Sequence, residues 1–252
     1  MATEARLPLA SLCLPGALPA DREILPGVPA AAWLARVDAW RQALLAAPPG
    51  EVALYEEDAG EFAAALFGAW QAGRTPWLPG DVLPATLQRL AASACLGIGE
   101  LPGALVADAS GDPAALGELD PAACRLVLHT SGSTGEPAAI VKTLDQLDRE
   151  VDALESAFGA RLAGAHVHGT VSHQHIYGLL FRVLWPLSAG RAFAPRRLAF
   201  NEQLTALGET PLALVASPAH LKRLPANQDW SGLAAGLRAV FSSGGPLPPD
   251  AA

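Results

Sequence analysis

The stretch Leu126-Val-Leu-His-Thr-Ser-Gly-Ser-Thr-Gly-Glu-Pro-Ala-Ala-Ile-Val-Lys-Thr143 decides how this chain is organised. Its apolar run, residues 126–128, predicts a buried strand that leads into the small residues 130–135. Pro137 ends this loop, and a second extended segment follows at residues 139–141. Glycine lets a backbone turn tightly and approach a ligand, and Ser and Thr add hydroxyls beside backbone N–H groups. The sequence therefore predicts a concavity rich in donors, which suits a polyphosphate.

Two interpretations of this loop remain open from its residues alone. It differs from a Walker loop, because no Gly-Lys-Ser/Thr ends it and no helix starts directly after it. An ordinary turn between two strands is the alternative, since Gly and Ser are common in turns of every kind. The rest of the chain has to decide between them.

The composition is that of a compact globular protein. The chain has 252 residues, 51% of them hydrophobic and 17% charged, which is enough for a large core. The net charge of -8 argues against a nucleic-acid partner, which needs a basic patch. No apolar run approaches the roughly 18–20 residues that cross a bilayer, so no membrane partner is expected. Cys13, Cys95 and Cys124 lack disulfide or metal spacing, so we expect reduced thiols in the cytoplasm.

Alternating helical and extended patterns predict an α/β fold with layered, mostly parallel sheets flanked by helices. The Pro-rich first 30 residues predict an irregular arm over the domain rather than a signal peptide. Helices are predicted at residues 30–47, 61–72, 86–96, 143–158, 176–187 and 218–224, and strands at 52–55, 75–78, 104–107, 126–128, 139–141, 167–171, 192–193, 212–216 and 237–242. Thr143-x-x-Gln146 fits a capping box, and the acidic residues of helix 143–158 are expected on a solvated face. Gly164 marks a border between two predicted subdomains, residues 1–160 and 161–252.

Three motifs together resemble one superfamily. Thr130-Ser-Gly-Ser-Thr-Gly-x-Pro137 after a hydrophobic strand resembles the phosphate-loop signature of the adenylate-forming enzymes, which include acyl- and aryl-CoA synthetases, luciferases and the adenylation domains of peptide synthetases. Ser172-His-Gln-His-Ile-Tyr-Gly178 resembles their aromatic/His-x-x-Gly segment, and Ser242-Ser-Gly-Gly-Pro-Leu247 resembles their Ser-Gly-Gly/Ala-x-Leu turn. The Gln-His-x-Tyr-Gly run and the Lys-Thr pair are also similar to acyl or aryl ligases associated with arylpolyene and xanthomonadin clusters.

The resemblance implies an activity and a set of site residues. ATP would activate a carboxylic acid to an acyl-adenylate, with Mg²⁺ sharing the phosphate charge, and the acyl group would pass to coenzyme A or to a carrier-protein phosphopantetheine. His175 would border the carboxylate pocket near the α-phosphate as the candidate catalytic residue, with Tyr177 and Gly178 in the same wall. The nucleotide would be held by Thr130, Ser131, Gly132, Ser133, Thr134, Gly135, Lys142, Ser243, Gly244 and Gly245.

The chain departs from the superfamily's pattern in several places. Ala138 stands where a Lys is usual, and Thr143-Leu144 replaces a Thr-His pair. Later motifs of the superfamily are absent: the Tyr/Thr-Glu near adenine, the ribose-binding Asp, the hinge, and the catalytic Lys of the C-terminal domain. We therefore expect a partial N-terminal domain of a longer enzyme, inactive by itself, with a natural short form as the alternative. Lys142 would face the same side as Ala138 but about 13 Å further along at roughly 3.3 Å per residue. We expect it to support the site, by anchoring the loop or pairing with an acid, and a solvated lysine is the alternative.

Four histidines raise the possibility of a metal site, because His-x-His on a strand points both rings the same way. These are His166, His168, His173 and His175, and no carboxylate or Cys stands at a matching spacing, so no protein-bound metal is predicted. His166 and His168 are expected in the core or on the surface. Two other functional classes stay open: a non-catalytic module that binds a nucleotide or a carrier protein, and an α/β domain whose loop binds nothing.

Overall fold

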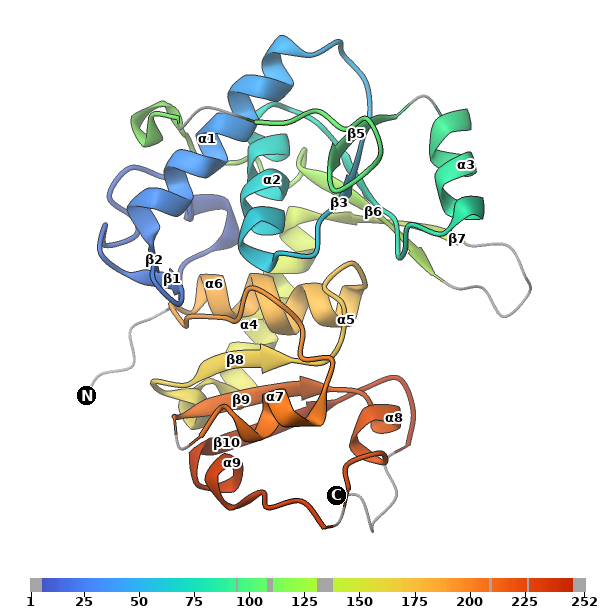
Figure 1. Ribbon diagram of the computed structural model, residues 1–252. Coiled ribbons are helices and arrows are strands. Elements are labelled where there is room, and N and C mark those ends of the chain that lie inside the picture. Colours follow the sequence, from blue (N-terminus) through green and yellow to red (C-terminus); the bar gives the residue numbers. More distant parts are fainter. Residues whose placement is uncertain are drawn as a thin grey trace.

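The computed structural model describes residues 6–93, 95–107, 111–130, 138–208, 210–225 and 227–246 (Figure 1). Two larger sheets, mostly parallel and flanked by helices, confirm the predicted fold class, and a third sheet is a two-stranded antiparallel hairpin. The strands are β1 (Glu23–Leu25), β2 (Val28–Pro29), β3 (Val52–Tyr55), β4 (Pro76–Leu78), β5 (Leu96–Gly99), β6 (Arg125–Thr130), β7 (Ala138–Thr143), β8 (His166–Gly169), β9 (Leu212–Ala216) and β10 (Leu237–Ser242). The helices are α1 (Ala30–Ala46), α2 (Ala59–Gln71), α3 (Pro84–Ala92), α4 (Leu144–Phe158), α5 (Ile176–Gly178), α6 (Trp185–Ser188), α7 (Asn201–Thr205), α8 (Pro218–Leu221) and α9 (Ser231–Gly236).

The larger sheet has the strand order β5-β3-β4-β6-β7. Its first four strands are parallel, and β7 returns antiparallel to β6, so that Thr130 pairs with Ala138. Helix α2 is buried along almost its whole length beneath α1, and it begins where Asp58 accepts hydrogen bonds from Gly60 N and Glu61 N. The hairpin of β6 and β7 therefore places both ends of the predicted phosphate loop at one edge of this sheet.

The smaller sheet has the order β10-β9-β8 and is parallel throughout. Helices α4, α5 and α6 lie between the two sheets (Figure 1). A π-helical turn, Leu179–Leu184, joins α5 to α6, so the helix predicted at residues 176–187 is present but is not α-helical throughout. The carboxyl ends of β8, β9 and β10 lie at one edge of the smaller sheet.

Helix α4 has the predicted capping box, formed by Thr143 and Gln146. The prediction that its acidic residues form a solvated face is wrong at two positions. Asp148 binds Arg6 of the N-terminal arm at 2.9 Å, and Glu155 binds Arg191 at 2.6 Å. Each of these carboxylates pairs with a guanidinium, so the polar side of α4 anchors other segments and does not face only water.

The N-terminal arm is irregular, as predicted, but it contributes to the core and does not simply lie over it. Leu9 and Leu12 are fully buried, and Cys13 is 1% exposed. The ties that hold the arm include the Arg6 ion pair with α4, the hydrogen bond from Leu9 N to the Asp148 carboxylate at 2.7 Å, and that from Leu7 N to Ser188 O at 2.9 Å. The prolines prevent a regular helix here without keeping the apolar side chains out of the core.

Several other predictions of where elements begin and end are wrong. The helix predicted at residues 86–96 ends at Ala92, and Leu96–Gly99 forms β5 beside β3. Gly99 has a φ of +82°, and a Cβ there would overlap the Tyr55 carbonyl, so glycine is required. The strands predicted at 104–107 and 192–193 amount to single bridges, Ile98 with Leu105 and Val167 with Phe193. The hairpin of β1 and β2 and the short helices α7 and α9 were not predicted from the sequence.

Candidate functional site

The carboxyl edges of the two sheets meet at the segment that follows β8. Residue Glu56 follows β3, and its backbone carbonyl lies 2.7 Å from Nε2 of His173 and accepts a 3.0 Å hydrogen bond from Nε2 of Gln174. Ala59 N donates to Pro195 O at 2.7 Å across the same junction. Ligand sites in α/β folds lie at the carboxyl ends of parallel strands, so this junction is the candidate site.

His175 stands between β8 and α5 and is exposed. Its ring lies against Gly80, just after β4, where an added Cβ would come within 2.6 Å of its Cε1 atom. The Thr86 hydroxyl and Leu83 N hold the pKa of the neighbouring Asp81 below its usual value, and the charge of His175 adds to this effect. His175 therefore reaches the carboxyl end of the larger sheet from the smaller one, with an open face toward solvent.

Tyr177 and Gly178 follow directly in α5. The Tyr177 ring packs on Phe181 with centroids 4.8 Å apart, and its buried hydroxyl has no hydrogen-bond partner among the described residues. Burial raises the pKa of this phenol, so it is a neutral donor at pH 7. Any Cβ at Gly178 would overlap the carbonyl of Ser172, so the tight turn at residues 172–178 requires glycine. His175, Tyr177 and Gly178 thus come together in one compact segment.

Polar groups beneath this segment were not predicted as site residues. Burial raises the pKa of Glu56 to about 7, opposed by a hydrogen bond from Asp58 N and assisted by the nearby Glu100 carboxyl. Burial also lowers the pKa of His173 to about 4, and the charge of Arg182 lowers it further. One feature of the sequence could have indicated this polar cluster: Arg182 is a single charged residue within the apolar run 179–187.

The hairpin side of the site is described only in part. Thr130 is the last residue of β6, and Ser131, Gly132, Ser133, Thr134 and Gly135 lie outside the described residues. The Lys142 ammonium binds Oε1 of Glu150 at 2.7 Å, with 27% of the lysine side chain exposed. Pairing with an acid is one of the two supporting arrangements predicted for Lys142, the other being an anchor for the loop. Because that pair turns Lys142 toward α4, it does not offer its ammonium freely to the loop.

Ser243, Gly244 and Gly245 continue from the carboxyl end of β10 and are exposed. Gly244 has a φ of +93°, a left-handed conformation that favours glycine. Strand β9 separates β10 from β8, so these residues lie along the same edge as His175 but two strands away. Their exposed backbone could line one side of a ligand bound across this edge.

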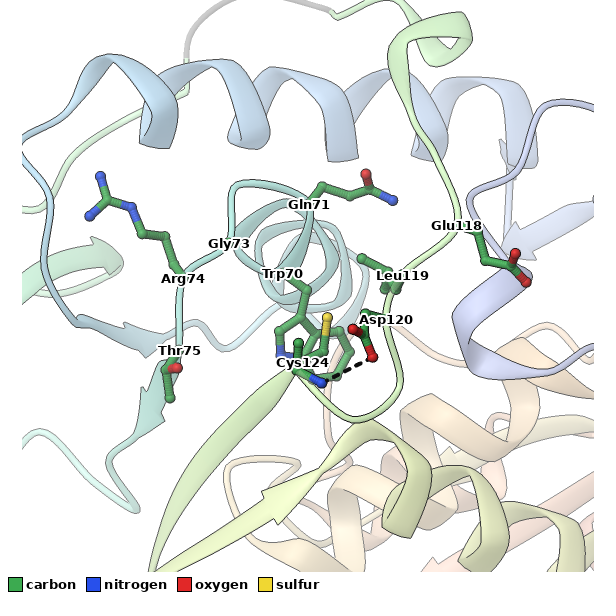
Figure 2. A pocket seen from close by; sticks show the side chains of 10 residues that line it. Trp70, Gln71, Gly73, Arg74, Thr75, Glu118, Leu119, Asp120 and Cys124 are labelled. Atoms are coloured by element: carbon green, nitrogen blue, oxygen red, sulfur yellow. Dashed lines mark hydrogen bonds between the residues drawn. The ribbon is translucent and has the colours of Figure 1, made fainter.

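A cavity of about 310 Å³ lies at the opposite edge, beside the amino ends of β4 and β6 (Figure 2). Its polar groups are already used within the fold: Gln71 donates to Gly117 O, Arg74 donates to carbonyls that include Leu44 O, and the Asp120 carbonyl accepts from Cys124 N. This cavity therefore joins loops together and is a poor candidate for the catalytic site.

Among the described residues, no group of three or more His, Cys, Asp and Glu side chains is arranged to hold a metal ion. His168 is a largely buried histidine whose pKa is lowered to about 4 by burial, and His166 is half-buried. No described helix has both the length and the apolar character needed to cross a membrane.

Residues 88–252, well over half of the chain, match the family described as AMP-binding enzyme. The chain belongs to the AMP-binding enzyme family. This confirms the resemblance to adenylate-forming enzymes that the three motifs indicated. The matched residues include the loop, the His175 segment and the Ser-Gly-Gly turn.

Individual relatives agree with the family. A 4-coumarate–CoA ligase of Rhodobacter capsulatus is 36% identical over 129 residues, which cover 48% of this chain and 31% of that protein. A malonyl-CoA ligase in a ternary product complex with methylmalonyl-CoA and AMP is 26% identical, with a TM-score of 0.73, over 97% of this chain and 57% of that one. ATP-bound MatB from Rhodopseudomonas palustris shares the fold, at 18% identity and a TM-score of 0.75, over 98% of this chain and 56% of that one. The chain thus spans about a third of the curated relative and somewhat over half of these solved structures.

Proposed function

We propose that this protein is an AMP-forming acid–thiol ligase, which activates an acyl or aryl carboxylic acid with ATP and passes it to a thiol. The observation that carries the proposal is the family match over residues 88–252, which includes the phosphate loop and the segment after β8. That segment contacts Glu56 after β3 and Gly80 after β4. The names of two relatives, a 4-coumarate–CoA ligase and a malonyl-CoA ligase with AMP bound, support the reaction class.

The chemistry explains why such a site needs the residues proposed for it. A carboxylate attacks the α-phosphate of ATP, so two anions must be held together, and orientation and positive potential matter more than proton transfer. We assign the β- and γ-phosphates to the loop Thr130–Gly135, whose N–H groups and hydroxyls suit them, with Mg²⁺ sharing the charge. His175, Tyr177 and Gly178 would wall the carboxylate pocket, and Ser243, Gly244 and Gly245 would form a backbone wall for the nucleotide or the acyl group. The unpartnered Tyr177 hydroxyl supports this role, because a ligand oxygen would satisfy it.

We also propose the acceptor, the location and the subdomains. Coenzyme A is the favoured thiol, because both relatives are named as CoA ligases, and a carrier-protein phosphopantetheine is the alternative. Cys13, Cys95 and Cys124 are free thiols, which supports a reducing compartment such as the cytoplasm. The division into residues 1–160 and 161–252 is supported by the separate sheet that begins at β8.

A second function, nucleotide binding without catalysis, is favoured by one observation. Of the two lysines in the chain, Lys142 is paired with Glu150, and Ala138 stands where the superfamily usually has Lys. A site with weakened positive potential would bind a nucleotide or a carrier protein but would not bring two anions together.

Acid-dependent exchange of labelled pyrophosphate into ATP separates the two functions. The assay uses the full-length protein with a panel of aryl and fatty acids, followed by coenzyme A or a phosphopantetheinylated carrier protein. We expect exchange with at least one acid and thioester formation with coenzyme A. ATP binding without exchange for every acid in the panel would support the non-catalytic module instead.

A further inference from the structure

Arg182 places a buried guanidinium at the candidate site, and the proposed function gives it no role. Its side chain is 2% exposed, and it projects from the π-helical turn that joins α5 to α6. The arginine stem lies across Gly169, the last residue of β8, where an added Cβ would come within 2.5 Å of its Cδ atom. Helices with a π turn occur frequently at functional sites, because the wider turn redirects side chains.

No carboxylate neutralises this arginine directly among the described residues. Burial lowers the pKa of Arg182 to about 10, so it stays charged at pH 7, while the charges acting on it are Arg197 and Glu57. Glu57 is already engaged, since it accepts from the Tyr55 hydroxyl at 2.7 Å and pairs with Arg197 at 3.6 Å. A buried charge without a direct partner carries a free-energy cost that an apolar residue would avoid.

The polar contact made by Arg182 is with the segment that carries His175. Its Nη1 donates to the carbonyl of Val171 at 2.6 Å, while Nη2 has no hydrogen-bond partner among the described residues. The same segment, residues 170–175, is fastened at its other end to β3 by His173 and Gln174, which both reach the Glu56 carbonyl. Arg182 therefore ties the β8 end of the segment, and the Glu56 carbonyl ties the end next to His175.

We propose that Arg182 is a positioning residue that holds residues 170–175 in the conformation that presents His175 beside Gly80. It acts through the segment and does not touch the substrate. Without the Val171 tie, the segment keeps the bond from Thr170 N to Val215 O at 2.9 Å and the bonds to the Glu56 carbonyl, but the stretch between them loses its anchor. His175 then samples orientations other than the one against Gly80. The consequence for catalysis rests on the proposed function, whereas the consequence for the segment does not.

Amide hydrogen exchange on this chain tests whether Arg182 holds residues 170–175 in place. The readout is the exchange rate of peptides covering residues 170–175 divided by that of β9, so that a uniform loss of stability cancels. Arg182→Met should raise this ratio about tenfold or more, because local opening costs less once the tie is gone. Arg182→Lys keeps the charge and one donor, and should return the ratio to within about threefold of wild type.

Two further variants complete the test, one as an independent perturbation of the Arg182 side chain and one as a control. Gly169→Ala displaces the arginine stem without changing any charge, and it should also raise the ratio. Its Cβ would come within 3.0 Å of the Val215 carbonyl as well, so if Arg182→Met does not fold, the double variant Gly169→Ala with Arg182→Lys decides the matter by whether the smaller stem brings the ratio back toward wild type. Arg191→Met removes another buried arginine, one that binds Glu155 and not the segment, and it should leave the ratio unchanged. The proposal is overturned if folded Arg182→Met and Gly169→Ala both keep the wild-type ratio, or if Arg191→Met raises it equally.

The effect of Arg182 on catalysis is measured in the full-length enzyme. Arg182→Met should lower kcat of adenylate formation by about tenfold or more with the KM for ATP within about twofold, since ATP contacts are untouched and His175 is misplaced. Arg182→Lys should recover most of kcat. An unchanged kcat in an Arg182→Met enzyme whose exchange ratio has risen would refute positioning of His175. If wild type forms no adenylate with any acid, the proposed function fails, and the exchange ratio still decides whether Arg182 holds the segment.

Discussion

The ion pair between Arg191 and Glu155 offers the sharpest test of the packing between the two sheets. Nη1 and Nη2 of Arg191 reach the two carboxylate oxygens at 2.6 and 2.7 Å, and Trp185 Nε1 donates to the same carboxylate at 2.7 Å. The side chains are only 7% and 18% exposed. Arg191→Met leaves Glu155 largely buried without its cation, and breaking a buried pair in this way costs about 3–5 kcal/mol.

The loss of stability caused by Arg191→Met should fall at the lower end of that range. Glu155 keeps its hydrogen bond from Trp185 and some contact with water, so we expect a loss of about 3 kcal/mol. For a chain of this size each kcal/mol lowers Tm by about 2–4 °C, which gives a shift of about 6–12 °C at pH 7. Thermal unfolding followed by circular dichroism measures it directly.

The Tm shift caused by Arg191→Met should be larger at neutral pH than at acidic pH. Burial opposes ionisation of Glu155, but the hydrogen bonds from Arg191 and Trp185 outweigh it and hold its pKa below the usual value. A depressed folded-state pKa contributes stability above the unfolded pKa of about 4.3, and this stability is lost as pH falls through the folded value. The Tm difference between wild type and Arg191→Met should therefore be full at pH 7 and shrink below about pH 4.

An exposed pair supplies the control. Arg149 and Asp145 form an ion pair within α4 with side chains 78% and 45% exposed, so Arg149→Met should cost no more than about 0.5 kcal/mol. If Arg191→Met shifts Tm no further than this control, the description of Glu155 as a buried, paired carboxylate is wrong.

Three further predictions concern the site. Gly178→Ala should cost about 1–3 kcal/mol, because its Cβ overlaps backbone atoms of Ser172 that cannot step aside; a wild-type Tm would contradict the described turn. Lys142→Ala should change stability by less than about 1 kcal/mol and slow adenylation in the full-length enzyme by up to about tenfold, whereas a loss of about a thousandfold would make Lys142 a direct phosphate ligand. Glu56 has a folded pKa raised to about 7, so its contribution to stability is full below about pH 4 and is lost as pH rises through 7; Glu56→Gln should flatten this decline in Tm, and an identical pH profile would refute the raised pKa.

Local sequence signals predicted the elements whose ends are set by local chemistry. The strands at residues 52–55, 212–216 and 237–242 agree with β3, β9 and β10, and the capping box at Thr143 begins α4 as expected. The apolar runs and the cap residues are sufficient there, because each strand is bounded by turn-forming residues and the helix start by a side-chain hydrogen bond.

Elements that depend on tertiary packing were predicted less well. Leu96–Gly99 was assigned to a helix, because its pairing with β3 is a long-range contact that a local window does not contain. The acidic residues of α4 were assigned to solvent, because their partners, Arg6 and Arg191, stand far away in the sequence. At the candidate site, His175, Tyr177 and Gly178 were predicted from the motif, and their role stays a prediction. The hydrogen bond from Arg182 to Val171 O is visible only in three dimensions.

The central proposal is that the loop Thr130–Gly135 holds the β- and γ-phosphates of ATP while the carboxylate of the acid attacks the α-phosphate. Acid-dependent pyrophosphate exchange by the full-length protein, compared with a variant in which Gly132 and Gly135 are both replaced by Val, tests this most directly. Valine at both positions blocks close approach of the backbone to the phosphates, so exchange should fall at least about a hundredfold, or about 2.7 kcal/mol, with the fold intact. Exchange at the wild-type rate in the folded double variant would contradict the claim.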